Sequence, residues 1–160
     1  MDELLFHHYD ASPFSEKIRL CFGHKGLAWR SVLQPQVMPK PHLVPLTGGY
    51  RRIPVLQVGA DVYCDSQCIA RALERLRPEP TLFPGGSEGL CFATGFWADR
   101  LLFQAAVPVL FSRIGPAVPE AFIEDRRQLL GGQLDFRAVM AAGPVMADHL
   151  RAHAALVETP

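Results

Sequence analysis

Proline and glycine cluster at residues 78–88, and this cluster divides the sequence into two parts of different character. Before it, short apolar runs alternate with turn residues, whereas after it apolar positions recur at helical spacing. Prolines and paired glycines interrupt regular elements, so the cluster is typical of a connection between domains. We therefore expect a first domain over residues 1–78, a linker over 79–88 and an all-helical domain over 89–160.

Size and charge exclude several classes of protein. A chain of 160 residues can bury roughly 70% of its unfolded surface, so it needs no disulfide or metal to hold a core. Sixteen basic residues balance sixteen acidic ones, and such a chain has no global field to attract a nucleic acid. The ligand is therefore expected to be small.

The sequence predicts no association with a membrane. The uncharged apolar stretch between Arg100 and Arg113 has 12 residues and contains Pro108, whereas a membrane span needs about 20. The first residues lack a basic region followed by an apolar core, as a secretory leader would have. We therefore expect a cytoplasmic protein.

Histidine and cysteine do not form a metal-binding pattern. Cys64 and Cys68 lie across a predicted strand-to-helix corner with no second pair of ligands, which makes a zinc site improbable. His7 and His8 are adjacent on a strand, so they point to opposite faces of the sheet. We expect packing or solvent roles for both histidines and no metal.

The first domain reads as strand, helix, strand, loop, strand, strand and helix. Four prolines and two glycines make residues 34–52 a loop with at most a short helix. A tight turn at 59–61 predicts an antiparallel hairpin. Strands are expected at residues 3–9, 27–33, 53–58 and 62–64, and helices from Pro13 to Gly23 or Gly26 and from Asp65-Ser66 to Arg77.

The second part reads as helical throughout. Its apolar residues recur at helical spacing, and Pro108 lies near the end of the first helical segment. The expected helical segments are Leu90 to Phe111, Pro119 to Leu130, and Asp135 to Leu156 with an interruption at Gly143-Pro144.

Ser12 precedes Pro13 at the start of the first predicted helix. A serine cap followed by proline is favoured there on local grounds, so Ser12 can simply be a cap. Alternatively, the positive end of the helix dipole favours the thiolate form of a bound thiol, and the Ser12 hydroxyl donates a hydrogen bond to that sulfur. Ser12 lacks the G-x-S-x-G context of a hydrolase nucleophile.

Two later segments carry similar local signals. Pro54 at the start of a strand indicates an edge strand or a special geometry such as a cis peptide bond. Asp65-Ser66 places an acid and a hydroxyl at a helix N-terminus, which suits a ligand with an amine and a carboxylate. Each signal is ordinary alone, but the three in this order within residues 12–66 are uncommon.

With these segments in place, residues 4–78 resemble the glutathione transferase superfamily. Residues 9–19 (YDASPFSEKIR) resemble the active-site turn of its Ser/Cys-type classes, namely zeta, theta and omega. Residues 53–56 (IPVL) resemble its cis-proline segment, and residues 65–66 its acid-serine pair. The resemblance implies an α/β, thioredoxin-like N-terminal domain followed by an all-α domain, in agreement with the division derived above.

The resemblance also implies roles for individual residues. Ser12 would hydrogen-bond the glutathione sulfur, and a serine where omega-like enzymes have cysteine argues against mixed-disulfide chemistry. The Ile53 backbone would pair with the cysteinyl part of glutathione as an added strand would. Lys40 resembles the omega-like lysine that contacts the glycyl carboxylate of glutathione. The acid-serine pair would hold the γ-glutamyl end of glutathione. The implied glutathione-binding residues are Phe14, Lys40, Ile53, Pro54, Asp65 and Ser66.

Tyr9 is the second candidate for the thiolate bond, because other classes of the family use a tyrosine near the end of the first strand. Its alternative role is packing between strand and helix. A small electrophile would bind between Phe14 and the helical domain. Candidates for that wall, which can equally be core residues, are Phe96, Trp97, Arg100 and Phe103.

The second part departs from the family. Family helical domains run longer and carry a Ser/Thr-x-x-Asp capping box in a late helix, and no such box follows Gly132. Either the sequence ends inside a longer protein, or this is a shortened relative. Apolar residues 101–111 would then lack partners, which favours dimerisation, and the family is usually dimeric. We expect a homodimer.

Two functions of different class follow. The first is a glutathione transferase that lowers the pKa of the bound thiol below about 8.5, so that the thiolate attacks a small electrophile or isomerises an unsaturated acid through an adduct. The second is a non-catalytic glutathione-transferase-like binding or interaction module. Ser12, Pro54 and Ser66 together favour at least glutathione binding, because capping alone could be done by Thr, Asn or Asp. A thioltransferase would need a reactive cysteine near Ser12, and Cys21 lies more than two helical turns away.

Overall fold

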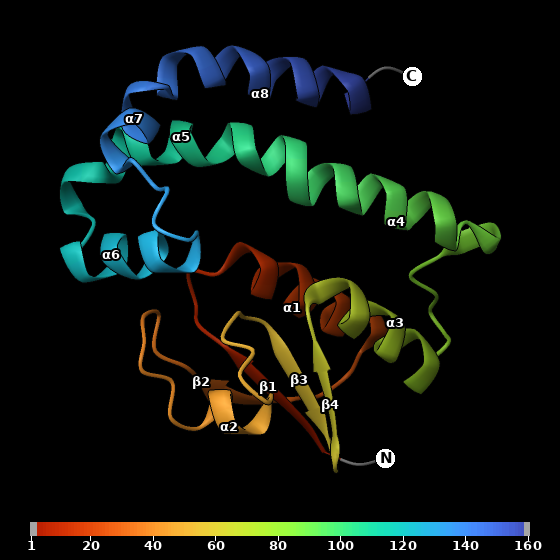
Figure 1. The fold of residues 1–160 in the computed structure, drawn as a ribbon. Coiled ribbons are helices and arrows are strands. Elements are labelled where there is room, and N and C mark those ends of the chain that lie inside the picture. The colour runs from red at the N-terminus through yellow and green to blue at the C-terminus, as the bar shows by residue number, and fades with distance from the viewer. Residues whose placement is uncertain (1–2, 159–160) are drawn as a thin grey trace. The chain divides into compact units, whose positions relative to one another are not determined.

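The computed structural model of the chain describes residues 3–158, so the expectation about a leader falls partly on residues outside the described part. Contacts divide the chain into two compact units, one ending at Glu88 and one beginning at Gly89. The first contains a sheet and helices and the second contains helices only (Figure 1). The predicted fold class, an α/β part followed by an all-α part, is confirmed.

The N-terminal unit has the predicted order of elements, but its second strand is shorter than expected. Residues 27–29 do not join the strand, because the Leu27 N–H donates to the Phe22 carbonyl at 3.0 Å and closes the preceding helix. The elements are β1 (Leu4–His8), α1 (Pro13–Lys25), β2 (Arg30–Leu33), α2 (Leu43–Leu46), β3 (Val55–Val58), β4 (Asp61–Cys64), α3 (Ser66–Leu76) and a 3₁₀ turn at Pro84–Gly86.

The strands form one mixed sheet in the order β2-β1-β3-β4 (Figure 1). β1 pairs with β2 in parallel and with β3 antiparallel, and β4 is antiparallel to β3. The parallel pair is joined through α1, as a parallel connection requires a crossover. This topology is thioredoxin-like.

Helix α1 shows how local sequence fixes both of its ends. Ser12 is the N-cap and Pro13 occupies the first turn, where its missing N–H is not needed. At the other end Gly26 takes a left-handed conformation with φ of 59°, which an L side chain rarely adopts. Between them Ile18 and Phe22 face the sheet and are buried.

The core of this unit lies between the sheet and the two longer helices. Phe6 of β1 pairs with Leu56 of β3, and both side chains are fully buried. Ile18 of α1 and Ile69 and Leu73 of α3 pack against them in the same cluster. Burying each such side chain contributes roughly 1.5–3 kcal/mol, so this cluster fixes the position of α1 and α3 on the sheet.

Lys25 ties the segment after α3 to the N-terminal unit. Its side chain is fully buried, and its ammonium contacts Glu74 Oε2 at 2.7 Å. The same group donates to the carbonyls of Arg77 at 2.6 Å and Pro80 at 3.0 Å, so all three of its protons have acceptors. Although burial opposes it, hydrogen bonds from Lys25, Thr81 and the Leu82 backbone hold the pKa of Glu74 below its ordinary value. Part of the expected linker is therefore folded onto α1 and α3.

The C-terminal unit consists of helices that match the predicted segments closely. The expected break at Gly143 is present, because one helix ends at Ala141 and the next begins at Gly143. A Cβ at Gly143 would lie 2.3 Å from Ser112 Cβ on a neighbouring helix, so the close approach requires glycine. Pro108 lies inside a helix. The elements are α4 (Glu88–Trp97), a π-helical segment (Ala98–Leu102), α5 (Phe103–Ile114), a 3₁₀ turn (Gly115–Ala117), α6 (Glu120–Leu129), α7 (Phe136–Ala141) and α8 (Gly143–Glu158).

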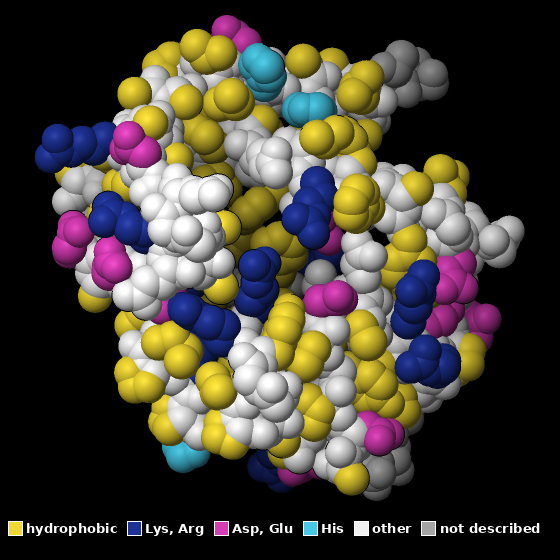
Figure 2. Space-filling view, in the orientation of Figure 1, with side chains coloured by type: hydrophobic (Ala, Val, Ile, Leu, Met, Phe, Trp, Pro, Cys, Tyr) yellow, Lys and Arg dark blue, Asp and Glu magenta, His cyan; other side chains and the backbone are white. Residues whose placement is uncertain are grey.

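The described surface carries both signs of charge. Basic and acidic side chains lie near one another over much of the visible face (Figure 2), consistent with the net charge of +0. Among residues 3–158, no helix is long and apolar enough to cross a membrane.

The Lys25 contacts give a test of the fold. In Lys25→Met we expect a loss of about 2–3 kcal/mol in the free energy of unfolding, because Glu74 and two carbonyls lose a buried partner. Urea unfolding followed by circular dichroism measures it. Arg75→Met, at an exposed position of α3, is the matched control and should change stability by less than about 0.5 kcal/mol. Equal stability of the two variants would contradict the assigned role of Lys25.

Candidate functional site

The strand register brings three chain segments to one edge of the sheet. β1 runs toward His8, and His7 pairs with Val55 at the start of β3. Val55 also pairs with Cys64 at the end of β4. The loops that continue from these ends therefore meet at the same edge. These loops are residues 9–12, 53–54 and 65–66. We call the place where they meet, at the ends of these strands, the site edge.

Ser12 is positioned by the turn between β1 and α1. Its N–H donates to the Tyr9 carbonyl at 3.1 Å, and its Oγ accepts from the Ser15 N–H at 3.2 Å. Because Oγ is the acceptor in that bond, the hydroxyl proton of Ser12 can be donated to a further group. The cap and the chemical role expected for Ser12 are therefore compatible in one geometry.

The Ile53-Pro54 peptide bond is cis. Of the two alternatives left open for Pro54, the edge strand is excluded, because β3 lies between β1 and β4. The special geometry is confirmed. Pro54 is buried, whereas Ile53 is partly exposed at the edge where the three segments meet.

Asp65 and Ser66 begin α3. Asp65 has φ of 66° and ψ of 158°, and its Oδ1 accepts from the Cys68 N–H at 2.8 Å. Such a conformation in a residue with a side chain costs about 1–3 kcal/mol and is concentrated at ligand sites. The exposed carboxylate retains capacity for further donors, and Ser66 beside it is 5% exposed.

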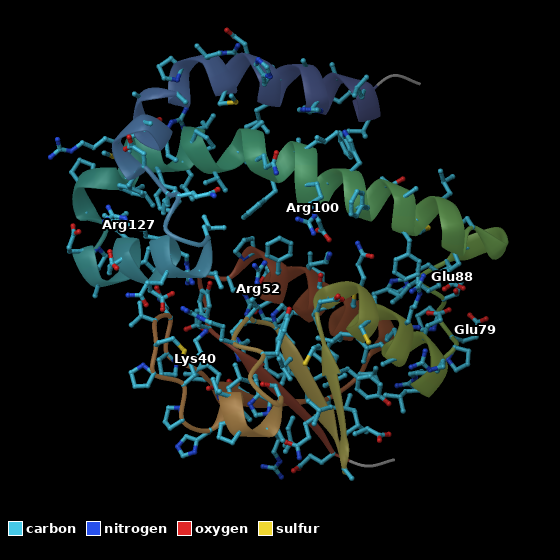
Figure 3. All side chains as sticks on the ribbon, in the orientation of Figure 1. Lys40, Arg52, Glu79, Glu88, Arg100 and Arg127 are labelled. Atoms are coloured by element: carbon cyan, nitrogen blue, oxygen red, sulfur yellow. The ribbon has the colours of Figure 1, made fainter. Side chains whose placement is uncertain are left out.

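Lys40 and Tyr9 lie together near the same edge. Lys40 is 3% exposed, and its ammonium donates to the Arg51 carbonyl at 3.0 Å. It also lies 6.0 Å from the centroid of the Tyr9 ring. An ammonium has three N–H donors, and one of those of Lys40 goes to this carbonyl. Arg52, on the loop before β3, is exposed; Lys40 and Arg52 are both labelled in Figure 3.

The residues expected to contact a second substrate come from both units. Phe14 is partly buried in the first turn of α1, with the Lys17 ammonium 5.7 Å from its ring centroid. In the C-terminal unit, the Arg100 guanidinium lies 5.6 Å from the ring of Phe96. Phe103 is partly buried in α5. A role for these residues toward a second substrate stays a prediction.

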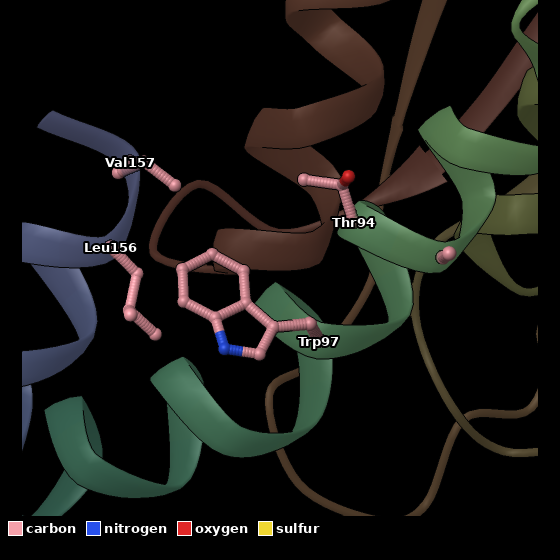
Figure 4. A pocket seen from close by; sticks show the side chains of 5 residues that line it. Thr94, Trp97, Leu156 and Val157 are labelled. Carbon is pink, nitrogen blue, oxygen red and sulfur yellow. The ribbon is translucent and has the colours of Figure 1, made fainter. Parts of the chain in front are cut away.

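A hollow of about 350 Å³ lies within the C-terminal unit between α4 and α8 (Figure 4). Trp97 forms one side and contacts the His153 ring, with the centroids 5.8 Å apart. Leu156 and Val157 on the other side are mostly exposed. Of the residues named above, only Trp97 lines it. The lining residues are Ala93, Thr94, Trp97, Leu156 and Val157.

Both N-terminal histidines are buried, as the packing interpretation predicts. His8 stacks on Phe6 with ring centroids 5.1 Å apart. Burial, and then the Arg19 guanidinium, lower the pKa of His8 below its ordinary value, while Asp10 opposes them. Burial also lowers the pKa of His7, and the Gln57 side chain opposes this shift. The folded protein therefore favours two neutral imidazoles.

Sequence reasoning missed two features near the site. Arg19 bonds to His8, Glu16 and the Asp10 carbonyl. Only the three-residue spacing of the Glu16–Arg19 pair was visible in the sequence. The second is Tyr50, whose pKa is raised by burial and then by the negative charge of Asp65. Nothing in the local sequence places Tyr50 within electrostatic reach of α3.

Two of the four cysteines, Cys21 and Cys64, have raised thiol pKa values. Burial is the main cause that raises the pKa of the Cys21 thiol, and it is also the first cause for Cys64. Both thiols therefore favour the protonated form at neutral pH. Across the described part of the chain, no group of three or more His, Cys, Asp or Glu side chains could hold a metal ion.

Comparison with known proteins supports the interpretation of the N-terminal unit. Residues 6–81 match the family model described as "Glutathione S-transferase, N-terminal domain". A structure of a glutathione S-transferase-like protein from Pseudomonas syringae is 37% identical, with a TM-score of 0.65, and the match covers 95% of this chain and 63% of that one.

Two further matches are more distant. A glutathione S-transferase U4 from Arabidopsis thaliana is 24% identical over 107 residues, which cover 67% of this chain and 47% of the relative. A theta class glutathione S-transferase from Xanthomonas axonopodis pv. citri with glutathione bound is 23% identical, with a TM-score of 0.67 and coverage of 99% and 72%. At that identity the likeness concerns the fold. The chain spans about half the length of the curated relative that it matches.

The fold and the site edge define a thioredoxin-like domain joined to a helical unit. Residues 6–81 belong to the glutathione S-transferase N-terminal domain family, and the 37% identical structure extends the likeness over 95% of this chain. The resemblance inferred from the residue motifs is thereby confirmed.

The lowered histidine pKa values predict how stability depends on pH. The unfolded chain binds more protons than the folded one below about pH 6.5. Stability should therefore be fully present above that pH and decrease as the pH falls through it. Urea unfolding between pH 7.5 and 5.5 should show this slope, and His7→Gln and His8→Gln should each reduce it. His42→Gln, at an exposed position, should leave the slope unchanged, and an unchanged slope in all three variants would refute the assignment.

Proposed function

We propose that this chain binds glutathione at the edge formed by residues 9–12, 53–54 and 65–66 and stabilises its thiolate with the Ser12 hydroxyl. The thiolate then reacts with a small electrophile, as a transferase or as a glutathione-dependent isomerase. The observation that carries the proposal is the geometry of Ser12. Its Oγ accepts from the Ser15 N–H at 3.2 Å at the N-terminus of α1, so its proton remains available for a bound sulfur.

Two electrostatic contributions would favour the thiolate. A hydrogen bond from a hydroxyl stabilises the charged form of its acceptor. The N-terminus of α1 carries the positive end of the helix dipole, which favours negative charge within the first turn. The proton leaves to solvent, and the sulfur then forms a bond to an electrophilic carbon. In a transferase a leaving group departs, or the electron pair of a double bond takes up a proton. In an isomerase the C–S bond of the adduct breaks again after rotation, which regenerates the double bond and the thiolate.

The other parts of glutathione find complementary groups along the same edge. The exposed Asp65 carboxylate suits the γ-glutamyl amine, and Ser66 with the N-terminus of α3 suits its carboxylate. The Ile53 backbone supports pairing with the cysteinyl part as an added strand. For the glycyl carboxylate, Lys40 remains the predicted partner, although its ammonium already donates to the Arg51 carbonyl.

Neither Cys21 nor Cys64 is favoured as the nucleophile, which supports a thiol supplied by the substrate. The pKa values of Cys21 and Cys64 are raised, so neither is poised as a thiolate. Ser12 itself holds a hydroxyl where a thioltransferase would need a reactive cysteine.

The proposal predicts separate effects for two serines. In Ser12→Ala we expect the pKa of the bound thiol to rise by about one unit, because one hydrogen bond to the thiolate is lost. In Ser66→Ala we expect about tenfold weaker binding of glutathione. Isothermal titration measures binding, and thiolate absorbance against pH measures the pKa.

A control variant and the possible outcomes separate a transferase from a binding module. Ser87→Ala, in the segment after α3 and outside the site edge, should leave both quantities unchanged. Binding with an unshifted thiol pKa would favour the non-catalytic module. A folded wild-type protein that does not bind glutathione would refute the proposal.

The proposal includes a homodimer, which exposed apolar side chains of the C-terminal unit support. Residues of α4, the π-helical segment and α5 contribute them: Leu90 is 70%, Phe96 56%, Leu101 52% and Leu110 51% exposed. We expect Leu101→Glu to yield monomers in sedimentation equilibrium at concentrations where wild type is dimeric. A wild-type protein that is already monomeric would contradict the proposal.

A further inference from the structure

Arg19 connects the turn before Ser12 to the strands behind it. Its Nε donates to Glu16 Oε2 at 2.6 Å, and its Nη2 donates to the Asp10 carbonyl at 2.9 Å. Its Nη1 lies 3.0 Å from His8 Nδ1. One planar guanidinium thus contacts the helix, the turn and the end of β1 with three different nitrogens, an arrangement that a lysine ammonium does not reproduce.

His8 must be neutral for this arrangement. Arg19 has donors only, so His8 Nδ1 has to be the acceptor in their contact. The ring proton is then on Nε2, which lies 2.8 Å from Ser31 Oγ on β2. A continuous chain of hydrogen bonds therefore runs from β2 through His8 and Arg19 to the Asp10 carbonyl.

That carbonyl belongs to the turn that carries Ser12. The turn is closed by the Ser12 N–H, which donates to the Tyr9 carbonyl at 3.1 Å. Asp10 and Ala11 are its two central residues and are exposed. The Arg19 side chain therefore restrains the orientation of the Asp10–Ala11 peptide, which lies one residue before Ser12.

We propose that Arg19 is a positioning residue for Ser12 and that His8 makes this positioning sensitive to pH. The inference rests on the proposed function, because its readout is the thiol that Ser12 would stabilise. Arg19 holds the turn so that the Ser12 hydroxyl points at the bound sulfur. Protonation of His8 removes the acceptor for Nη1 and places a second cation 3.0 Å from the guanidinium.

The charged groups around His8 determine the direction of the effect. Arg19 opposes protonation and Asp10 favours it, while Glu16 partly neutralises Arg19 across their ion pair. Phe6 and Trp29, which pack against the ring, carry no charge. Protonation should therefore be disfavoured at neutral pH and should release the turn as the solution becomes acidic.

A double-mutant cycle tests the positioning role. Arg19→Lys keeps the charge but loses the three-way contact, so the pKa of bound glutathione should rise by about 0.5–1 unit. In the Ser12→Ala background the same change should add nothing. Arg75→Lys is the matched control, and urea unfolding of every variant separates positioning from a loss of fold. An equal pKa rise in the presence and absence of Ser12, or no rise at all, would overturn the proposal.

The variant His8→Gln tests whether protonation of His8 makes glutathione binding sensitive to pH. Wild type should bind glutathione several-fold more weakly at pH 5.5 than at pH 7.5, because a protonated His8 no longer accepts from Arg19. In His8→Gln the side-chain amide oxygen accepts at both pH values, so binding should be retained at pH 7.5 and vary less with pH. The same loss in both proteins would overturn this part.

The thiol pKa separates this inference from the proposed function. If wild type binds glutathione but the thiol pKa is not lowered, the proposed function fails and this inference fails with it. If the thiol pKa is lowered but does not change in Arg19→Lys, only this inference is refuted.

Discussion

The register between β1 and β3 is the constraint on which the rest of the N-terminal unit depends. With Phe6 opposite Leu56, both side chains enter the core, and His7 comes opposite Val55 at the site edge. A slip of one residue would turn the apolar set of β1 to the other face and offset the Ser12 turn from the Ile53-Pro54 peptide. The burial that stabilises the sheet therefore also aligns the three segments of the candidate site.

Much of the fold could be predicted from the sequence because its signals are local. The Ser12-Pro13 start, the Gly26 end and the hairpin before Asp65 each follow from the conformations that those residues allow. The second strand is shorter than predicted, because residues 27–29 are apolar enough for a strand but the Leu27 N–H is used to close α1. Local pattern does not show which partner a backbone N–H will find.

The site was predicted in part for the same reason. Residues at helix starts and at the proline-led strand were visible as motifs, whereas Arg19 and Tyr50 act across long separations in the chain. Arg19 contacts His8 eleven residues away, and Tyr50 is influenced by Asp65 on α3. For Lys40 the sequence showed the motif but not the contact, because the buried hydrogen bond to the Arg51 carbonyl depends on the fold.

The Lys25 contacts have a consequence for anyone who wishes to produce the first domain alone. A fragment that stops at residue 78, where the helical pattern ends, would remove the Pro80 carbonyl from a fully buried ammonium. It would also remove Thr81 and Leu82, which hydrogen-bond Glu74. A fragment that extends to Glu88 retains these partners, so the domain boundary is set by the satisfaction of one buried charge and lies beyond the last turn of α3.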